Sequence, residues 1–224
     1  PYVDGQGVER WHVASGQLSD EEYARALATE PERVGGSMNG GFVLGNKGAG
    51  KSRFLENIAI GLKRMGVVVV YLDPQEGASS PALMKHADWA LRGLDSAEDS
   101  LGNVLALYTA LQRIVEVRQD ENTLWGVTGF QHTRRRPAIA VIVEECHKVF
   151  NIVDPESQTS FGELFGEIDR IGRKLGITFI GATQDPTQDS FGGSLVLRRG
   201  MTDVNAYALR YTGQNASLAI NSLT

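Results

Sequence analysis

Apolar residues occur along the chain in short runs separated by longer segments of mixed polarity. Residues 42–44, 67–72, 139–143 and 177–182 form apolar or β-branched runs of strand length, and residues 195–198 predict a further strand. Runs of this kind are typical of strands buried on both faces. Because helical segments separate them, they predict an α/β fold with a mainly parallel sheet covered by helices on both faces.

Three of the intervening segments carry apolar residues at helical spacing. They span residues 51–64, 101–115 and 161–175, and Gly66 and Gly176 follow the first and the last of them. An apolar stripe of this period predicts a helix packed against a sheet, and a glycine just beyond it is a common helix end.

The N-terminal part of the chain differs from the rest. Residues 1–33 are polar and weakly patterned, and are predicted to form an appendage to a domain spanning 34–224. Ser19-Asp20-Glu21-Glu22 is typical of a capping box and predicts a short helix that stops before Pro31. Because the chain begins at Pro1 without methionine, we expect a fragment of a longer protein.

Composition and charge narrow the possible partners. The 224 residues carry a formal net charge of −5, so a polyanion would need a local basic patch or a ring of subunits. Cys146 is the single cysteine, which excludes an intrachain disulfide and fits a reducing compartment. No apolar run is long enough to cross a bilayer.

One motif predicts a nucleotide site. Gly45-Asn46-Lys47-Gly48-Ala49-Gly50-Lys51-Ser52 matches the phosphate-binding P-loop between a predicted strand and a predicted helix. Glycines let the backbone wrap around phosphates, and the N–H groups of the loop and helix point at the anion. We expect Lys51 to reach the β- and γ-phosphates of ATP and Ser52 to coordinate Mg²⁺. Arg53 completes the predicted nucleotide-binding set.

Two carboxylates follow the most apolar predicted strand. Glu144 and Glu145 come directly after residues 139–143, and the carboxyl ends of parallel strands line the ligand crevice of such sheets. We expect Glu144 to hold metal-bound water and Glu145 to activate the water that attacks ATP. A solvated pair of acids at a strand end is the alternative interpretation.

The next predicted strand also ends in a polar residue. Gln184 follows Ala182-Thr183, where its amide is expected to sense the γ-phosphate or to position water. A plain turn before Asp185 is the alternative. Cys146 and His147 have no partners at metal-ligand spacing, so local packing is predicted for both.

Basic residues form two short clusters. Arg170, Arg173 and Lys174 lie near the end of a predicted helix, where they either complement the helix dipole or supply an arginine finger to a neighbouring subunit. Residues 134–136 are three arginines that either contact phosphate backbones or are simply solvated.

Together these segments resemble the FtsK/HerA group of ring-forming, DNA-pumping ATPases from about Gly41 to Asn215. Besides the P-loop and the paired acids, the resemblance is carried by Tyr71-Leu72-Asp73-Pro74-Gln75, Arg173-Lys174-Leu175-Gly176-Ile177 and Gly181-Ala182-Thr183-Gln184. There are departures. Gln75 replaces a lysine, and Asp185 stands where FtsK motors carry an arginine. Arg198, Arg199 and Arg210 are nearby candidates for DNA contact.

The resemblance implies a RecA-like P-loop NTPase core that uses ATP and Mg²⁺, with Glu145, Gln184 and a trans-acting Arg173 in catalysis. Within the group the chain looks most similar to TraB-type conjugative plasmid-transfer proteins, which move double-stranded DNA. This implies a homo-hexamer in the cytoplasm, at the inner face of the membrane, attached through segments outside this chain. A type VII-like protein-secretion ATPase and a nucleotide-binding regulator with little turnover stay open as alternatives.

Overall fold

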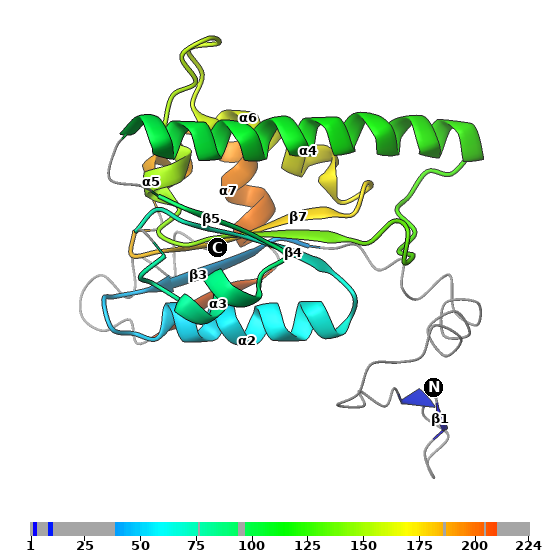
Figure 1. Ribbon diagram of the computed structural model, residues 1–224, viewed down its shortest axis with the longest axis horizontal. Helices are drawn as coiled ribbons and strands as arrows, with labels where there is room; N and C mark the ends of the chain where they lie inside the picture. The colour runs from blue at the N-terminus through cyan, green and yellow to red at the C-terminus, as the bar shows by residue number, and fades with distance from the viewer. Residues whose placement is uncertain are drawn as a thin grey trace.

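The computed structural model describes residues 2–3, 9–10, 39–75, 77–93, 97–185, 187–203 and 205–209 (Figure 1). The helix predicted before Pro31 and the candidate Arg210 lie outside these residues. Near the N-terminus, β1 (Tyr2–Val3) and β2 (Glu9–Arg10) form a separate antiparallel pair.

The main sheet has six strands in the order β5-β4-β6-β7-β3-β8, and every neighbouring pair is parallel. The strands are β3 (Gly41–Gly45), β4 (Val68–Asp73), β5 (Trp89–Arg92), β6 (Ile139–Val143), β7 (Ile177–Thr183) and β8 (Ala206–Leu209). The predicted parallel α/β sheet is confirmed. Its order inserts β7 between the strand that leads into the P-loop and the strand that ends in the two glutamates.

Helices cover both faces of this sheet, as predicted (Figure 1). On one face lie α2 (Lys51–Arg64) and α3 (Pro81–His86). On the other lie α4 (Ala97–Trp125), α5 (His147–Phe150), α6 (Phe161–Gly172) and α7 (Leu195–Thr202). α4 has 29 residues. In the part of the chain that the structure describes, no helix is both long and apolar enough to span a membrane.

The molecule has two hydrophobic cores, one on each face of the sheet, because successive side chains of a strand point to opposite faces. In β3, Phe42 and Leu44 pack into the larger core beneath α4, α6 and α7, whereas Val43 packs into the core beneath α2. In β4, Leu72 and Tyr71 alternate in the same way. Such strands are apolar throughout because both of their faces are buried.

The prediction of a strand at residues 195–198 is wrong, because these residues form the first turn of α7. Ser194 caps this helix by accepting a hydrogen bond from the Leu197 backbone at 3.2 Å. Leu197 and Met201, four residues apart, are both buried. A short apolar run does not distinguish a strand from a helix. Here the helix is favoured because it places Leu197 and Met201 on one buried face.

Two strands at the edges of the sheet were not predicted. β5 and β8 have four residues each, and most of their side chains are partly or fully exposed. They therefore lack the continuous apolar run that marks the central strands.

Gly162 allows α6 to lie directly against the 3₁₀ turn η1 (Gln188–Phe191). A Cβ atom at Gly162 would overlap the carbonyl oxygen of Phe191, which is a backbone atom and has little freedom to move aside. Gly102, on α4, has open space around the same position, with no atom within 4 Å.

We therefore expect Gly162→Ala to lower the free energy of unfolding by about 1–3 kcal/mol through overpacking. Gly102→Ala is the matched control, and it should raise this free energy by about 0.5–1 kcal/mol because alanine favours the helix. Urea unfolding followed by circular dichroism measures both. Equal effects of the two substitutions would contradict the close packing of α6 on η1.

Candidate nucleotide-binding site

β3 leads directly into the P-loop sequence at the carboxyl edge of the sheet. The strand ends at Gly45 and α2 begins at Lys51. Gly48 and Gly50 have φ angles of 78° and 99°, which glycine adopts without a steric cost. No side-chain hydrogen bond caps the start of α2, so the N–H groups of its first turn can bind an anion.

Lys51 extends from the first turn of α2 back over this loop. Its Nζ donates a hydrogen bond to the carbonyl oxygen of Gly45 at 2.9 Å and lies 3.7 Å from Glu145 Oε1. The residue is only 7% exposed. A lysine ammonium has three donors, so a buried one with a single hydrogen bond can still bind a phosphate oxygen.

Ser52 joins the same helix to the end of β6. Its hydroxyl donates a hydrogen bond of 2.5 Å to Oε1 of Glu144, whose Oε2 is buried without a hydrogen-bond partner among the described residues. Burial raises the pKa of Glu144 to about 7, against the opposing effect of the Ser52 hydrogen bond. The Glu144 carboxyl group is therefore buried away from solvent, next to the Ser52 hydroxyl.

This pair fits a magnesium ion. A hydroxyl oxygen and a carboxylate oxygen are the hard ligands that Mg²⁺ prefers, and Mg²⁺ usually takes its other ligands from water and nucleotide phosphates. Within the described ranges, no group of three or more His, Cys, Asp or Glu side chains could hold a metal by itself. The arrangement favours an ion shared with a nucleotide over a resident metal.

Glu145 lies in a sharp turn just after β6. Its φ of 40° is in the left-handed region, which is rare for a residue other than glycine. The next residue, Cys146, holds this turn against the sheet, because its backbone N–H donates a hydrogen bond to the Ala182 carbonyl oxygen on β7 at 2.9 Å. This conformation buries the Glu145 side chain, which faces Lys51.

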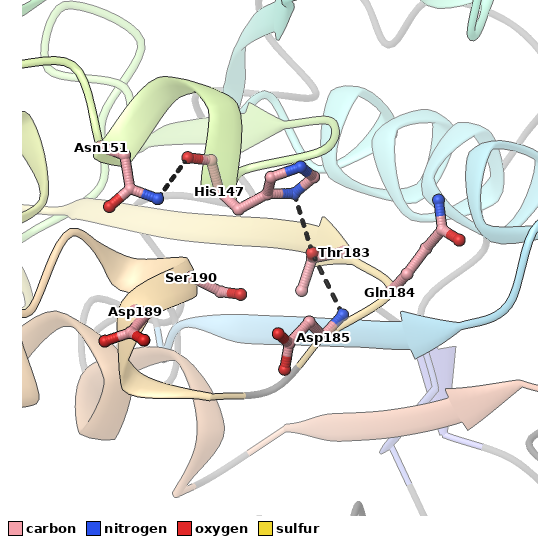
Figure 2. A pocket seen from close by; sticks show the side chains of 7 residues that line it. All are labelled: His147, Asn151, Thr183, Gln184, Asp185, Asp189 and Ser190. Atoms are coloured by element: carbon pink, nitrogen blue, oxygen red, sulfur yellow. Dashed lines mark hydrogen bonds between the residues drawn. The ribbon is translucent and has the colours of Figure 1, made fainter. Parts of the chain in front are cut away.

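Gln184 reaches Glu145 from the end of β7. Its Nε2 donates to Glu145 Oε1 at 3.2 Å. Beyond this contact lies an open pocket of about 360 Å³ lined by His147, Asn151, Thr183, Gln184, Asp185, Asp189 and Ser190 (Figure 2). The structure thus brings together the P-loop lysine and serine, the two glutamates and the glutamine at one edge of the sheet.

The remaining members of the predicted nucleotide set lie further out. Asn46 and Lys47 are exposed on the loop, and the Ala49 backbone N–H donates to the Asn46 carbonyl oxygen at 3.0 Å. The Arg53 side chain is 80% exposed, and its guanidinium pairs with Glu56. A role for Arg53 in binding nucleotide stays a prediction.

Arg173 is not part of this group of side chains. It follows α6 directly, exposed, four residues before β7 begins, and so belongs to the amino edge of the sheet. β7 has seven residues, and at about 3.3 Å per residue the two edges are separated by about 20 Å. Arg173 therefore lies too far away to contact the P-loop of its own chain.

The arginines at residues 134–136 are not equivalent. Arg136 is buried, donates to Asn122 Oδ1 at 2.7 Å and pairs with Glu121 at 3.0 Å. It stacks over Trp125 and Phe130 at ring-centroid distances of 5.3 and 5.4 Å. Of the three, Arg134 and Arg135 alone are exposed, so both interpretations, phosphate contact and simple solvation, are wrong for Arg136.

His147 differs from its predicted packing role, because its side chain is 37% exposed and its Nδ1 lies 3.6 Å from Glu145 Oε2. Cys146 is fully buried, in agreement with the prediction of packing. The sequence signal for His147 was its position two residues after Glu145.

The sequence matches no protein-family model, and a search of curated proteins finds no match. In fold, the chain is similar to the pCW3 conjugation coupling protein TcpA, whose monomer form was solved with ATPγS. The TM-score is 0.60 at 15% identity, over 83% of this chain and 52% of TcpA.

Two further structures are similar in fold to about the same degree. The cytoplasmic domain of EssC gives a TM-score of 0.60 at 16% identity, over 82% of this chain and 35% of EssC. The cytoplasmic domain of the Thermomonospora curvata type VII secretion ATPase EccC gives a TM-score of 0.58 at 22% identity, over 81% of this chain and 22% of EccC. This chain spans about half or less of these proteins. The predicted likeness to FtsK/HerA-type ATPases is confirmed at the level of the fold.

The raised pKa of Glu144 predicts how stability depends on pH in the protein without nucleotide or metal. The pKa of an ordinary glutamate is about 4.5, whereas burial raises the pKa of Glu144 to about 7. The folded state then binds more protons than the unfolded state between these values, so stability falls as pH rises through this window.

We expect Glu144→Gln to change the free energy of unfolding little at pH 5 and to raise it at pH 8, where the wild-type carboxylate is buried and charged. Urea unfolding in the presence of EDTA measures this at both values. Glu156→Gln, in an exposed loop, is the control and should show no such dependence. A gain of equal size at both pH values would contradict the raised pKa.

Proposed function

We propose that this chain is the motor domain of an ATPase that moves double-stranded DNA, in conjugative plasmid transfer or chromosome segregation. The ATPase part of the proposal is carried by one observation: Lys51 and Ser52, in the first turn of α2, contact Glu145 and Glu144, which follow β6. A cation, a metal-binding hydroxyl and two carboxylates at a loop that fits phosphates are the groups that ATP hydrolysis requires.

In this mechanism, the P-loop backbone and Lys51 would bind the phosphates, and Ser52 and Glu144 would hold Mg²⁺. The ion would offset charge on the phosphate oxygens. Glu145 accepts a proton from the attacking water, and Gln184, which contacts Glu145, helps to orient that water. The contacts among these side chains support a preorganised site.

Arg173 is proposed to act on the nucleotide of a neighbouring subunit, which requires a ring. The proposed assembly is a homo-hexamer in the cytoplasm at the inner face of the membrane, anchored by segments outside this chain. The similarity in fold to TcpA, a conjugation coupling protein, supports the proposed role in conjugation.

A protein-secretion motor is the second candidate. It is favoured by the similarity to the type VII secretion ATPase EccC and by an EccC structure in complex with a signal sequence peptide, which has a TM-score of 0.59 at 16% identity. The net charge of −5 and the exposed Asp185 also fit a protein substrate better than DNA.

Two substitutions separate binding of ATP from turnover. Lys51→Ala should weaken ATP binding at least about tenfold because it removes a buried charge-assisted donor to phosphate. Glu145→Gln should bind ATP but lower kcat by about 100-fold or more, because the base is lost. Titration with a fluorescent ATP analogue and a phosphate-release assay measure the two effects. Rapid turnover by Glu145→Gln would refute the assignment of the base.

The choice between the two substrates depends on stimulation. For a DNA motor, steady-state hydrolysis should rise severalfold with double-stranded DNA and lose this gain between about 50 and 200 mM salt, because phosphate contacts release counterions. A rate of ATP hydrolysis that DNA does not change and that a signal peptide raises would favour the protein-secretion motor. Lys51→Ala serves as the background control in both assays.

A further inference from the structure

We infer that His147 is a positioning residue for Glu145: its Nδ1–H binds Glu145 Oε2 during turnover and fixes the carboxylate that activates water. The inference rests on the proposed ATPase function and adds a residue to it. His147 is the first residue of α5, so the turn that carries Glu145 also carries the imidazole.

The imidazole stands between two oxygen atoms. Its Nδ1 lies 3.1 Å from Thr183 Oγ1 and 3.6 Å from Glu145 Oε2. Figure 2 shows the ring above the end of β7, with the dashed contact to Thr183. A shift of a few tenths of an ångström would bring Oε2 within hydrogen-bond distance. The Thr183 hydroxyl is thus the hydrogen-bond partner of the ring in this structure.

Glu145 has one oxygen that needs such a partner. Oε1 is contacted by Gln184 and by Lys51, whereas Oε2 is buried with no hydrogen bond among the described residues. A buried acceptor without a donor costs about 1–3 kcal/mol. A carboxylate held at one oxygen also turns readily, because its last torsion is broad.

Nucleotide binding would leave the Glu145 carboxylate with fewer partners. Lys51 and His147 are the basic side chains within 4 Å of the Glu145 carboxylate in the part of the chain described. When Lys51 turns to the phosphates, as the proposed function requires, His147 is left as the donor beside Oε2. Bonding there leaves Oε1 directed at Gln184, where the attacking water would lie.

The surroundings leave the ring accessible. His147 lines the open pocket of about 360 Å³, and Asp185 and Asp189 line the same pocket. A small planar molecule can enter a space of this size from solvent. This allows a test by chemical rescue.

We expect His147→Ala in the full chain to lower kcat by about 10- to 100-fold, because a misplaced base loses its alignment. The KM for ATP and the Kd for ATPγS should stay within about twofold, because neither the P-loop nor the metal pair is touched. Added imidazole should restore part of the lost kcat. His147→Asn, whose amide nitrogen can occupy the place of Nδ1, should keep most of it. Asp189→Asn, in the same pocket, is the control and should match the wild type.

The outcomes separate the two proposals. A wild-type chain that does not hydrolyse ATP overturns the proposed function and this inference with it. An active wild type with an equally active His147→Ala overturns the inference alone. A loss in His147→Ala that neither imidazole nor asparagine relieves, and that thermal melting traces to unfolding, also overturns it. Rescue by imidazole with an unchanged Kd for ATPγS supports it.

Discussion

The whole of β6 is buried on both faces and is hydrogen-bonded to β4 on one side and β7 on the other, so its chain can turn only where the strand ends. The first two residues beyond it are Glu144 and Glu145. The Cys146 N–H bond to β7 fixes this turn and holds Glu145 at a φ of 40°. Because both neighbouring strands are parallel to β6, their ends meet the same edge, which explains why Gln184 reaches Glu145.

The negative charge gathered at this edge is the second determinant of the site. Asp73 is fully buried at the end of β4, where it accepts hydrogen bonds from the backbone N–H groups of Gln75 and Ser79. Burial, with the charge of Glu144 adding to it, raises the pKa of Tyr71 well above its usual range. Like charges packed this closely favour a bound cation, and Ser52 beside Glu144 is the place where a metal ion would offset them.

The sequence predicted those parts of the molecule whose signals are local. The P-loop, β6 and the strand β7 are marked by consecutive residues, and all three fall within a residue or two of their predicted places. The helix α7 was missed because a run of three apolar residues, Leu195–Leu197, fits either structure, and the deciding fact is a tertiary one, the burial of Leu197. The burial of Arg136 and the contact of His147 with Glu145 depend on segments brought together by folding, so no local pattern could predict them.

The two edges of the sheet differ in chemistry, and this limits how the proposed motor can work. The carboxyl edge holds the acidic site, whereas Arg173 and Lys174 lie at the amino edge, about 20 Å away along β7. A side chain cannot cross a packed sheet, so Arg173 can meet a P-loop only if the amino edge of one copy faces the carboxyl edge of the next. Such a contact joins two different surfaces, and repeated contacts of this kind form either a closed ring or an open filament. In the proposed ring, the basic Arg173 and Lys174 of one copy would face the acidic site of the next, and ATP hydrolysis that depends on protein concentration would be its direct consequence.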